Sequence, residues 1–440
     1  MSFELSDLQT AVKNDAAIRS RATLQPMGSP DDKVFPPTHA VDERRPRREE
    51  RAGAKYAQER RRINGEERLC VLLDSVQSQA NRMEDALYRL WKSKKIVLPV
   101  VTVDFGDEFP DLTGINSLTA PHRIADALLR DTCLGETLFR HSELGKSFAD
   151  ATLANAAPLF RVSPTALLFG IWDSTGPRGG LGFKLARNLT SEIIGVGATF
   201  GTKSSSRIDP TGIVKKPGEL TVYKANAPGE QWTVELDLAE KTAKGEPVKY
   251  GKDKQKAGTT TSINHSNIPP RLDVLAGGVT ISHAEQTAVL SLAGIRRLGF
   301  GTPTESEAAR TLLVALGLVA LLAAADDGYF LRSRCHLSPV LGKALAFQRV
   351  AKDGSDGRLM LTLDGALALY QAALDALPEN LCWHPWDAQK NTWSSTNLAA
   401  GTSIATLTAA PKLQQLVRVS RQLAAAGEVE EEAEGAESGD

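Results

Sequence analysis

The residues best suited to binding chemistry lie in the stretch Leu69–Trp91. One side of this stretch carries amide, hydroxyl and charged groups at the spacing of helical turns: Gln77, Ser78, Asn81, Arg82 and Asp85. Amides both donate and accept hydrogen bonds, whereas a merely solvated helix face more often carries Lys and Glu. Because free N–H groups at a helix start attract anions, the pattern indicates binding of a polar, phosphate-bearing ligand. The alternative is the solvated face of an ordinary amphipathic helix.

Two elements must position that polar face. Cys70–Leu73 is a short apolar run of the kind that forms a buried strand. Asp74 or Ser75 then offers a side-chain oxygen to the open N–H groups of a helix start. The apolar residues that follow recur at helical spacing and predict a helix with one buried side. They are Val76, Ala80, Met83, Leu87, Leu90 and Trp91.

Two basic segments precede this stretch. Ala16–Leu24 alternates apolar and polar residues, which predicts a strand that holds Arg19 and Arg21 on one face. Residues 42–68 are rich in arginine and glutamate. They either contact the phosphates of a nucleic acid or form a solvated helix or loop.

His122 and Arg123 stand at the start of a helix predicted over Pro121–Arg130, where proline fits the first turn. Both side chains are candidates for contacts with an anionic ligand. The alternative for His122 is a helix-cap role. Asp126 and Asp131 lie nearby, but no HExxH motif or third ligand accompanies them, so we predict no metal site.

A glycine-rich loop follows the apolar run Pro164–Asp173, which we predict to be a buried strand. Backbone N–H groups of such a loop can approach a phosphate closely, with Arg178, Lys184 and Arg187 supplying charge. The alternative is a simple turn. We expect Trp172 in the core rather than as a platform for stacking bases.

Nothing in the sequence has the form of a catalytic centre. No GxSxG segment anchors serine chemistry, and the four cysteines include no CxxC pair. Cys70 and Cys335 lie in apolar runs and are expected in the core. We therefore predict neither catalytic residues nor a cofactor, and a protein that is not an enzyme.

The composition is that of a globular protein, with 440 residues, 42% of them hydrophobic and 24% charged. Seven of the 53 acids fall within residues 428–440, so the remaining 46 face 52 bases and give the rest of the chain a charge of +6. A mildly basic body is compatible with nucleic-acid binding. No signal peptide is visible, and the apolar run Thr311–Ala325 is short for a membrane span. We expect a buried helix there and a cytoplasmic protein.

Strand, helix and strand follow one another twice along the chain, which favours an α+β fold with a split βαβ sheet. We expect a single domain over residues 16–427, with insertions at about 26–68 and 241–275 and a disordered acidic tail at 428–440. The remaining predicted elements are strands at Ile96–Val103, Glu230–Leu238 and Tyr329–Arg334 and helices at Thr304–Ala325, Ala366–Ala376 and about Ala409–Ala426.

Several segments between Ala16 and Arg334 together resemble one known family. They read LDSVQSQANRMEDAL, FPPTH, APHRIADALLRD, PTALLFGIWDST followed by GGLGFKLARNLTSEI, and DDGYFLRSRC. The family is the backbone subunit of the type I-G (formerly I-U) CRISPR surveillance complex, or Cascade, which belongs to the RAMP superfamily.

The resemblance implies a palm on a modified ferredoxin-like (RRM-type) sheet, an inserted finger region and a β-hairpin thumb. We expect the finger or charged insertion at about 26–68 and a thumb or finger excursion at about 241–275. Several copies would stack helically along one CRISPR guide RNA, hold its backbone without reading its bases, and leave the bases to pair with target DNA. Other partners would be the large and RNA-processing subunits and a recruited helicase-nuclease. No membrane is implied. The expected RNA-binding residues are Arg19, Arg21, Gln77, Ser78, Asn81, Arg82, His122, Arg123, Arg178, Lys184 and Arg187.

Two alternatives stay open. RAMP backbone subunits of type III complexes resemble this chain in their expected fold, and they cut target RNA in a metal-dependent reaction with an aspartate in the loop after the first strand. Asp31 and Asp32 occupy that loop here. The other alternative is an assembly protein that makes no RNA contact, whose self-association would not depend on RNA or salt.

Overall fold

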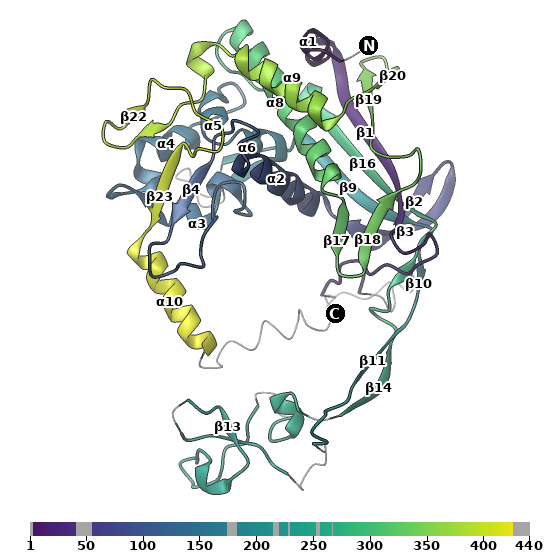
Figure 1. Ribbon diagram of the computed structural model, residues 1–440, viewed down its shortest axis with the longest axis vertical. Helices are drawn as coiled ribbons and strands as arrows, with labels where there is room; N and C mark the ends of the chain where they lie inside the picture. The colour runs from purple at the N-terminus through teal and green to yellow at the C-terminus, as the bar shows by residue number, and fades with distance from the viewer. Residues whose placement is uncertain are drawn as a thin grey trace. The chain divides into compact units, whose positions relative to one another are not determined.

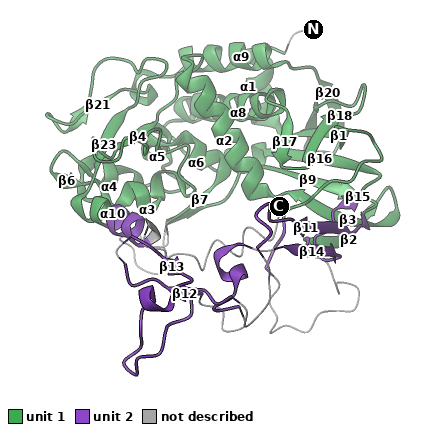
Figure 2. Cartoon of the chain, turned by 60° about the horizontal axis from the view of Figure 1, so that its bottom comes forward, with its two compact units in different colours: residues 1–37, 57–198, 280–415 green, residues 38–56, 199–279, 416–440 purple. Residues whose placement is uncertain are grey.

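The computed structural model describes residues 3–40, 55–173, 183–213, 220–227, 229–251, 256–265 and 267–425 (Figure 1). The chain forms two compact units, coloured green and purple in Figure 2. Unit 1 holds Met1–Pro37, Ala57–Ala198 and Thr280–Gln415, and unit 2 holds Thr38–Tyr56, Thr199–Val279 and Leu416–Asp440. The fold is mixed α and β with a curled antiparallel sheet, so the predicted α+β class is confirmed.

Unit 1 is built on an antiparallel sheet whose strands run in the order β17-β18-β1-β16-β9-β3-β2, with β19 on β1 and β20 on β19. The strands are β1 Asp15–Pro26, β2 Gln58–Ile63, β3 Glu66–Asp74, β9 Leu189–Val196, β16 His283–Ser291, β17 Tyr329–Arg332, β18 Cys335–Pro339, β19 Ala346–Ala351 and β20 Asp356–Leu359. One edge of β1 is shared, because β18 pairs with its last residues and β19 with its first.

The predicted alternation of β1 is confirmed. Ile18, Ser20 and Ala22 are buried, while Arg19 and Arg21 point to the other face. β16 alternates in the same way, and its register pairs Arg21 with Thr287. We call the face that carries Arg19 and Arg21 the open face of the sheet. The opposite face packs into the core beneath the helices.

Five helices of unit 1 accompany this sheet: α1 Leu5–Asn14, α2 Val76–Lys92, α7 Leu292–Ile295, α8 Pro303–Asp326 and α9 Leu363–Asp375. α8 packs against α1, α2 and α9 (Figure 1). It begins with a capping box, in which the Thr302 hydroxyl accepts from the backbone N–H of Glu305 and the Glu305 carboxylate accepts from that of Thr302.

α8 is apolar on almost every side, and such a helix is stable only when it is surrounded. By length and composition it could cross a membrane, yet 72% of its most apolar window is buried inside the protein. Leu313 and Leu318 of this helix have no exposed surface. The predicted buried helix at Thr304–Ala325 is confirmed. The helices predicted after Asp74 or Ser75 and at Ala366–Ala376 are confirmed as α2 and α9.

A smaller sheet in unit 1 has the order β4-β23-β5-β6, with β4 and β23 parallel. Its elements and their neighbours are β4 Val101–Asp104, η2 Arg123–Ala125, α3 Ala127–Arg130, β5 Thr132–Leu134, β6 Thr137–Leu138, η3 Phe139–His141, α4 Glu143–Ala149, α5 Ala157–Val162, α6 Pro164–Phe169, β7 Ile171–Asp173, β8 Phe183–Leu185, η7 Glu379–Leu381, β21 Trp386–Asp387, β22 Thr392–Trp393 and β23 Ala405–Ala409. α10, Pro411–Ala425, ends the described chain.

Three predicted elements in unit 1 differ from the structure. The strand predicted at Ile96–Val103 is only four residues long and begins at Val101. The helix predicted over Pro121–Arg130 is split, because the extended backbone of Asp126 separates η2 from α3. The strand predicted over Pro164–Asp173 is mostly the helix α6, since a short apolar run suits a buried helix as well as a buried strand. Gly170, at φ 81°, ends α6 and turns the chain into β7.

Unit 2 contains mostly short elements: β10 Thr199–Phe200, β11 Lys203–Arg207, β12 Tyr223–Lys224, β13 Trp232–Thr233, η5 Leu236–Leu238, η6 Thr260–Ile263, β14 Ile268–Asp273 and β15 Val279–Thr280, the last of which ends in unit 1. β11 and β14 form an antiparallel pair that begins at Lys203 and Asp273. The strand predicted at Glu230–Leu238 is confined to β13, because a 3₁₀ turn follows it. The basic residues 41–54 and the acidic tail lie outside the described residues.

Candidate nucleic-acid interface

The turn from β3 into α2 creates a buried acid. Ser75 caps α2, since its hydroxyl accepts from the backbone N–H of Ser78 at 3.2 Å. Asp74 is thereby free of the capping role and is fully buried. Its carboxylate accepts hydrogen bonds from the Ser78 hydroxyl and the Gln79 amide, each at 2.7 Å. A buried carboxylate needs such partners, because burial without them is costly.

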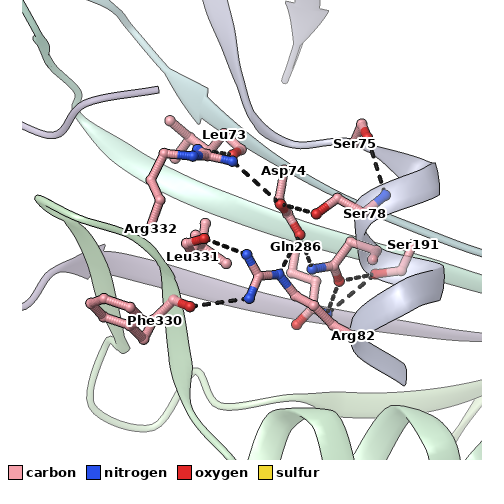
Figure 3. A network of polar contacts seen from close by, with 11 residues as sticks. Leu73, Asp74, Ser75, Ser78, Arg82, Ser191, Gln286, Phe330, Leu331 and Arg332 are labelled. Carbon is pink, nitrogen blue, oxygen red and sulfur yellow. Dashed lines mark hydrogen bonds and ion pairs between the residues drawn. The ribbon is translucent and has the colours of Figure 1, made fainter. Parts of the chain in front are cut away.

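Arg82 completes the environment of Asp74 (Figure 3). Its Nε donates to Asp74 at 3.0 Å, and its two terminal nitrogens donate to the backbone carbonyls of Phe330 and Leu331 on β17. Arg332 approaches the other carboxylate oxygen at 3.7 Å and donates to the Leu73 carbonyl at 2.8 Å. Arg82 therefore fastens α2 to the sheet. The acids nearest to Arg82 on α2 are used elsewhere, since Glu84 pairs with Arg123 and Asp85 pairs with Arg89.

A second branch of this network connects Gln79 of α2 to polar side chains of the sheet. The Gln79 carbonyl oxygen accepts from the Ser191 hydroxyl at 2.8 Å and from the Gln286 amide at 3.1 Å. Gln286 in turn accepts from the Tyr329 hydroxyl at 2.9 Å. Burial raises the pKa of Tyr329 to about 12, so this hydroxyl remains a donor at neutral pH. The branch joins α2 to β9, β16 and β17.

Only part of the polar face predicted on α2 is available to a ligand. Ser78 and Arg82 are used by Asp74, as described above. Gln77 and Asn81 are exposed, and within the described ranges no side-chain partner is found for either. The exposed amides of α2 are therefore the ones that a ligand can reach.

Arg123 is buried, not exposed. Its guanidinium donates to both carboxylate oxygens of Glu84, at 2.6 and 2.7 Å, and to the Gly170 carbonyl at 3.1 Å. It also lies over the Phe169 ring, 5.5 Å from the centroid. Burial raises the pKa of Glu84 to about 7, against the opposing effect of Arg123. This pair joins α2 to the segment between α6 and β7, so we assign Arg123 a structural role. His122 beside it is exposed.

Trp172 is exposed, so the expectation that it lies in the core is wrong. β7 and β8 form an antiparallel pair in which Ile171 faces Leu185 and Trp172 faces Lys184. Ile171 and Leu185 are buried, whereas 62% of Trp172 is exposed. A tryptophan has an area of about 150–250 Å², so leaving most of it in water forgoes on the order of 2–4 kcal/mol. Packing in the core therefore does not explain the exposed position of the Trp172 ring.

One cation lies at this ring. The Lys184 ammonium is 5.8 Å from the centre of the Trp172 ring. Arg187 is exposed, and its Nε donates to the Phe169 carbonyl at 3.0 Å. Burial and the nearby charge of Arg123 lower the pKa of Arg187 from its ordinary value, which links the two arginines in space. We call Trp172, Lys184, Arg187 and His122 the β7–β8 surface. Arg178 and its glycine-rich loop lie outside the described residues.

Arg19 and Arg21 lie elsewhere, on the open face of the sheet. Arg19 donates to Gln348 at 2.8 Å and to Asp356 at 2.8 Å, so its charge is already used within the protein. Arg21 is exposed, and within the described part of the chain its side chain has no hydrogen-bond or ion-pair partner. It lines an open cleft of about 580 Å³ together with His283 and other residues. The further lining residues are Ala22, Thr23, Asn64, Ser282, Glu285, Val340, Gly342, Lys343, Ala344 and Ala346.

The predicted site residues thus fall into two groups. Gln77 and Asn81 lie on α2, which Glu84 and Arg123 connect to the β7–β8 surface. Arg21 lies on the face of the sheet opposite the helices. A single sheet separates the two groups, so one short ligand segment cannot contact both.

Asp31 and Asp32 are exposed in the loop after β1. The backbone N–H groups of both residues bond to Ser29. No group of three or more His, Cys, Asp or Glu side chains that could hold a metal ion is found among the residues with described positions. The nuclease alternative stays a prediction.

Sequence reasoning missed the residues that organise α2. Asp74 follows an apolar run directly, and a charged residue at the buried end of a strand is a signal for a polar network. Tyr329 and Arg332 lie in the segment Tyr329–Arg334, which is predicted as a strand and so places both residues in a sheet. Their partners could not be found this way. Lys343 and His283 of the cleft carry no comparable pattern.

Comparison with known proteins adds one finding. Residues 18–200 match the protein family described as CRISPR-associated protein GSU0053. This segment contains β1, α2, β7, β8 and β9, and so most of the groups described above. No curated protein matches the chain. The match covers less than half of the chain, so the chain is similar to a CRISPR-associated family over residues 18–200.

Proposed function

We propose that this chain is the guide-RNA-binding backbone subunit of a type I-G CRISPR surveillance complex. In this proposal several copies stack helically along one guide RNA and hold its sugar-phosphate backbone. The bases remain free to pair with target DNA. The match of residues 18–200 to a CRISPR-associated family supports the setting. The observation that carries the molecular role is the order of strands in the main sheet.

That order fits a ferredoxin-like palm. Along the chain the elements β1, α2, β9, β16, α8 and β18 follow one another, and in space the strands lie in the order β18-β1-β16-β9. All three contacts are antiparallel. A split βαβ fold has this chain order and this arrangement, and many RNA-binding modules use it. In this interpretation β2, β3, β17, β19 and β20 extend the palm.

The insertions fit the same proposal. The connection between β9 and β16 contains the paired strands β11 and β14, which are the base of the β-hairpin thumb that we propose. The segment expected as a thumb or finger at about 241–275 belongs to this connection, and its residues IPPRLD form β14. The finger expected at about 26–68 would lie between β1 and β2, since Gln58–Ile63 is strand β2 of the main sheet.

The proposed contacts are non-specific. Phosphates are held by cations and 2′-hydroxyls by polar groups, and neither contact reads a base. Gln77, Asn81 and the β7–β8 surface supply such groups beside α2, and Arg21 supplies one on the open face. Ser78, Arg82 and Arg123 support these positions from within the protein. The other partners proposed are the large and RNA-processing subunits and a recruited helicase-nuclease, all in the cytoplasm.

The test is to purify the chain after expression with a guide RNA and to measure oligomer size and nuclease protection. The proposal expects several copies per guide, a protected RNA, and an affinity that falls steeply as salt rises, because each neutralised phosphate releases counterions. A strictly monomeric protein with an unprotected guide would contradict it. Self-association that ignores both RNA and salt would instead favour the plain assembly protein.

The same preparation tests whether the chain cuts RNA. We propose that it does not, and that DNA is cut by the recruited nuclease. The assembled complex is incubated with complementary RNA and a divalent metal, beside the double variant Asp31→Asn and Asp32→Asn. Cleavage by the wild type that the double variant lacks would establish the nuclease alternative. Intact RNA in both reactions is the expected outcome.

A further inference from the structure

The β7–β8 surface exposes an aromatic ring because of a strand register, not because of disorder at a loop tip. Pairing of β7 with β8 places Ile171 opposite Leu185 on the inner side and Trp172 opposite Lys184 on the outer side. Asp173, the next residue of β7, returns to the inner side, where it is 4% exposed and paired with Arg140 at 2.6 Å. Buried contacts on both sides of Trp172 therefore fix the ring outward.

The cation recorded at the ring on the outer side is Lys184, whose ammonium is 5.8 Å from the ring centre. Lys184 and Arg187 are exposed cations, and His122 is an exposed base close in sequence to Arg123. The acids of this region are turned inward, since Asp173 pairs with Arg140 and Glu84 pairs with Arg123. A partner that approaches Trp172 thus meets an aromatic face flanked by positive charge. Neither a protein core nor an acidic peptide requires a flat ring beside cations. A single-stranded nucleic acid uses both, because its bases stack on aromatic rings and its phosphates bind cations.

We infer that Trp172 is a stacking platform for one unpaired base of single-stranded RNA, with Lys184 on an adjacent phosphate. This inference rests on the proposed function and deepens it, because it names the kind of contact made beside α2. Every base has a π-face, so stacking holds a nucleotide without selecting its identity. It is therefore compatible with a grip that leaves the sequence unread.

The register also explains why Lys184 stands opposite Trp172. Its ammonium, 5.8 Å from the ring centre, lies at the ring rather than extended into water. A cation at this distance is attracted by the ring face and is held near the path of a backbone whose base stacks there. Removal of the Lys184 cation and removal of the Trp172 ring should consequently change different parts of the measured binding affinity. The cation contributes to the salt dependence, and the ring contributes to a term that salt does not change.

The experiment measures equilibrium binding of the full chain to a short fluorescent oligouridine and to an abasic oligomer with the same ribose-phosphate backbone. Four variants are compared with the wild type: Trp172→Ala, Trp172→Phe, Lys184→Ala and Phe330→Ala. Phe330 is the matched control, since it is an aromatic residue of the main sheet with 61% of its surface exposed. Thermal unfolding of each variant checks that an exposed substitution leaves the fold intact.

Base stacking on an aromatic residue corresponds to about a 5- to 150-fold change in affinity on truncation to alanine. We expect Trp172→Ala to lose that much for oligouridine, with an unchanged slope of affinity against salt. Trp172→Phe should keep most of the affinity, and Phe330→Ala should bind like the wild type. Lys184→Ala should reduce the salt slope by about 0.7, the share of one phosphate on a single strand. On the abasic oligomer, Trp172→Ala and the wild type should bind equally.

Two results would overturn the inference while leaving the proposed function in place. One is a wild type that binds RNA and a Trp172→Ala variant that binds it as tightly. The other is an equal loss by Trp172→Ala on oligouridine and on the abasic oligomer, which would make the ring a structural support. A wild type that binds neither oligomer, alone or assembled on a guide, would overturn the proposed function itself and the inference with it.

Discussion

The Nε atom of Arg82 lies 3.0 Å from the carboxylate of Asp74, across the first two turns of α2. The same guanidinium reaches two carbonyls of β17, so a single side chain joins the end of β3, the helix and an edge strand of the sheet. Asp74 is fully buried, whereas 34% of the Arg82 side chain is exposed. The pair therefore holds the exposed amides of α2 in place without offering its own charge fully to a ligand.

Arg82→Met should destabilise the protein on the order of 3 kcal/mol, because it leaves a buried carboxylate with fewer partners. Chemical denaturation of the purified chain measures the change. Arg82→Lys is the matched control and should recover only part of the loss, since an ammonium cannot reach the acid and two carbonyls at once. An Arg82→Met variant of full stability that binds RNA weakly would assign this arginine to the ligand instead.

Arg123→Met should cost about 3–5 kcal/mol of unfolding free energy, because it leaves the Glu84 carboxylate buried without its bidentate partner. The double variant Glu84→Leu with Arg123→Met should recover most of this loss, since neither charge then has to be desolvated. A double-mutant cycle in urea provides the measurement. Additive losses from the two single changes would show that the residues do not act as a pair.

Glu84 should make stability depend on pH between about 4.5 and 7. Its pKa is raised by burial to about 7 from an ordinary value of 4.5, so the folded state binds a proton in this window that the unfolded state does not. The free energy of unfolding should therefore fall as the pH rises through the window, by about 1.4 kcal/mol per unit at most. The contribution is fully present below about 4.5. Comparing the wild type with Glu84→Gln at several pH values isolates it, and parallel pH curves for the two proteins would refute it.

Arg21→Ala should weaken RNA binding and reduce the salt slope by about 0.7, because its charge is unpaired in the described structure and faces the cleft. Arg19→Ala, two residues away on the same face, is the natural comparison. Arg19 is occupied by Gln348 and Asp356, so its removal should change binding less. Binding curves at several salt concentrations decide between them. Equal slopes for Arg21→Ala and the wild type would remove the open face from the interface.

Local sequence patterns were enough to predict an element where the residues that determine it lie close together in the sequence. The unit from β3 to α2 was predictable because an apolar run, a capping serine and helical spacing follow one another within a few residues. The buried helix α8 was predictable because the apolar run Thr311–Ala325 is too short for a membrane span and lacks a polar side. Short apolar runs carried too little information, which is why α6 was predicted as a strand.

What the sequence by itself determined is the class of the fold, the alternation of β1 and the polar character of α2, since propensity and periodicity act over neighbouring residues. Only the tertiary structure decided which polar groups remain for a ligand. Arg82 meets carbonyls almost 250 positions away, and Arg123 meets an acid 39 positions away. Trp172 faces outward because β8 pairs with β7 in one register. Such choices depend on which distant segments the folded core brings together, and no local pattern encodes that.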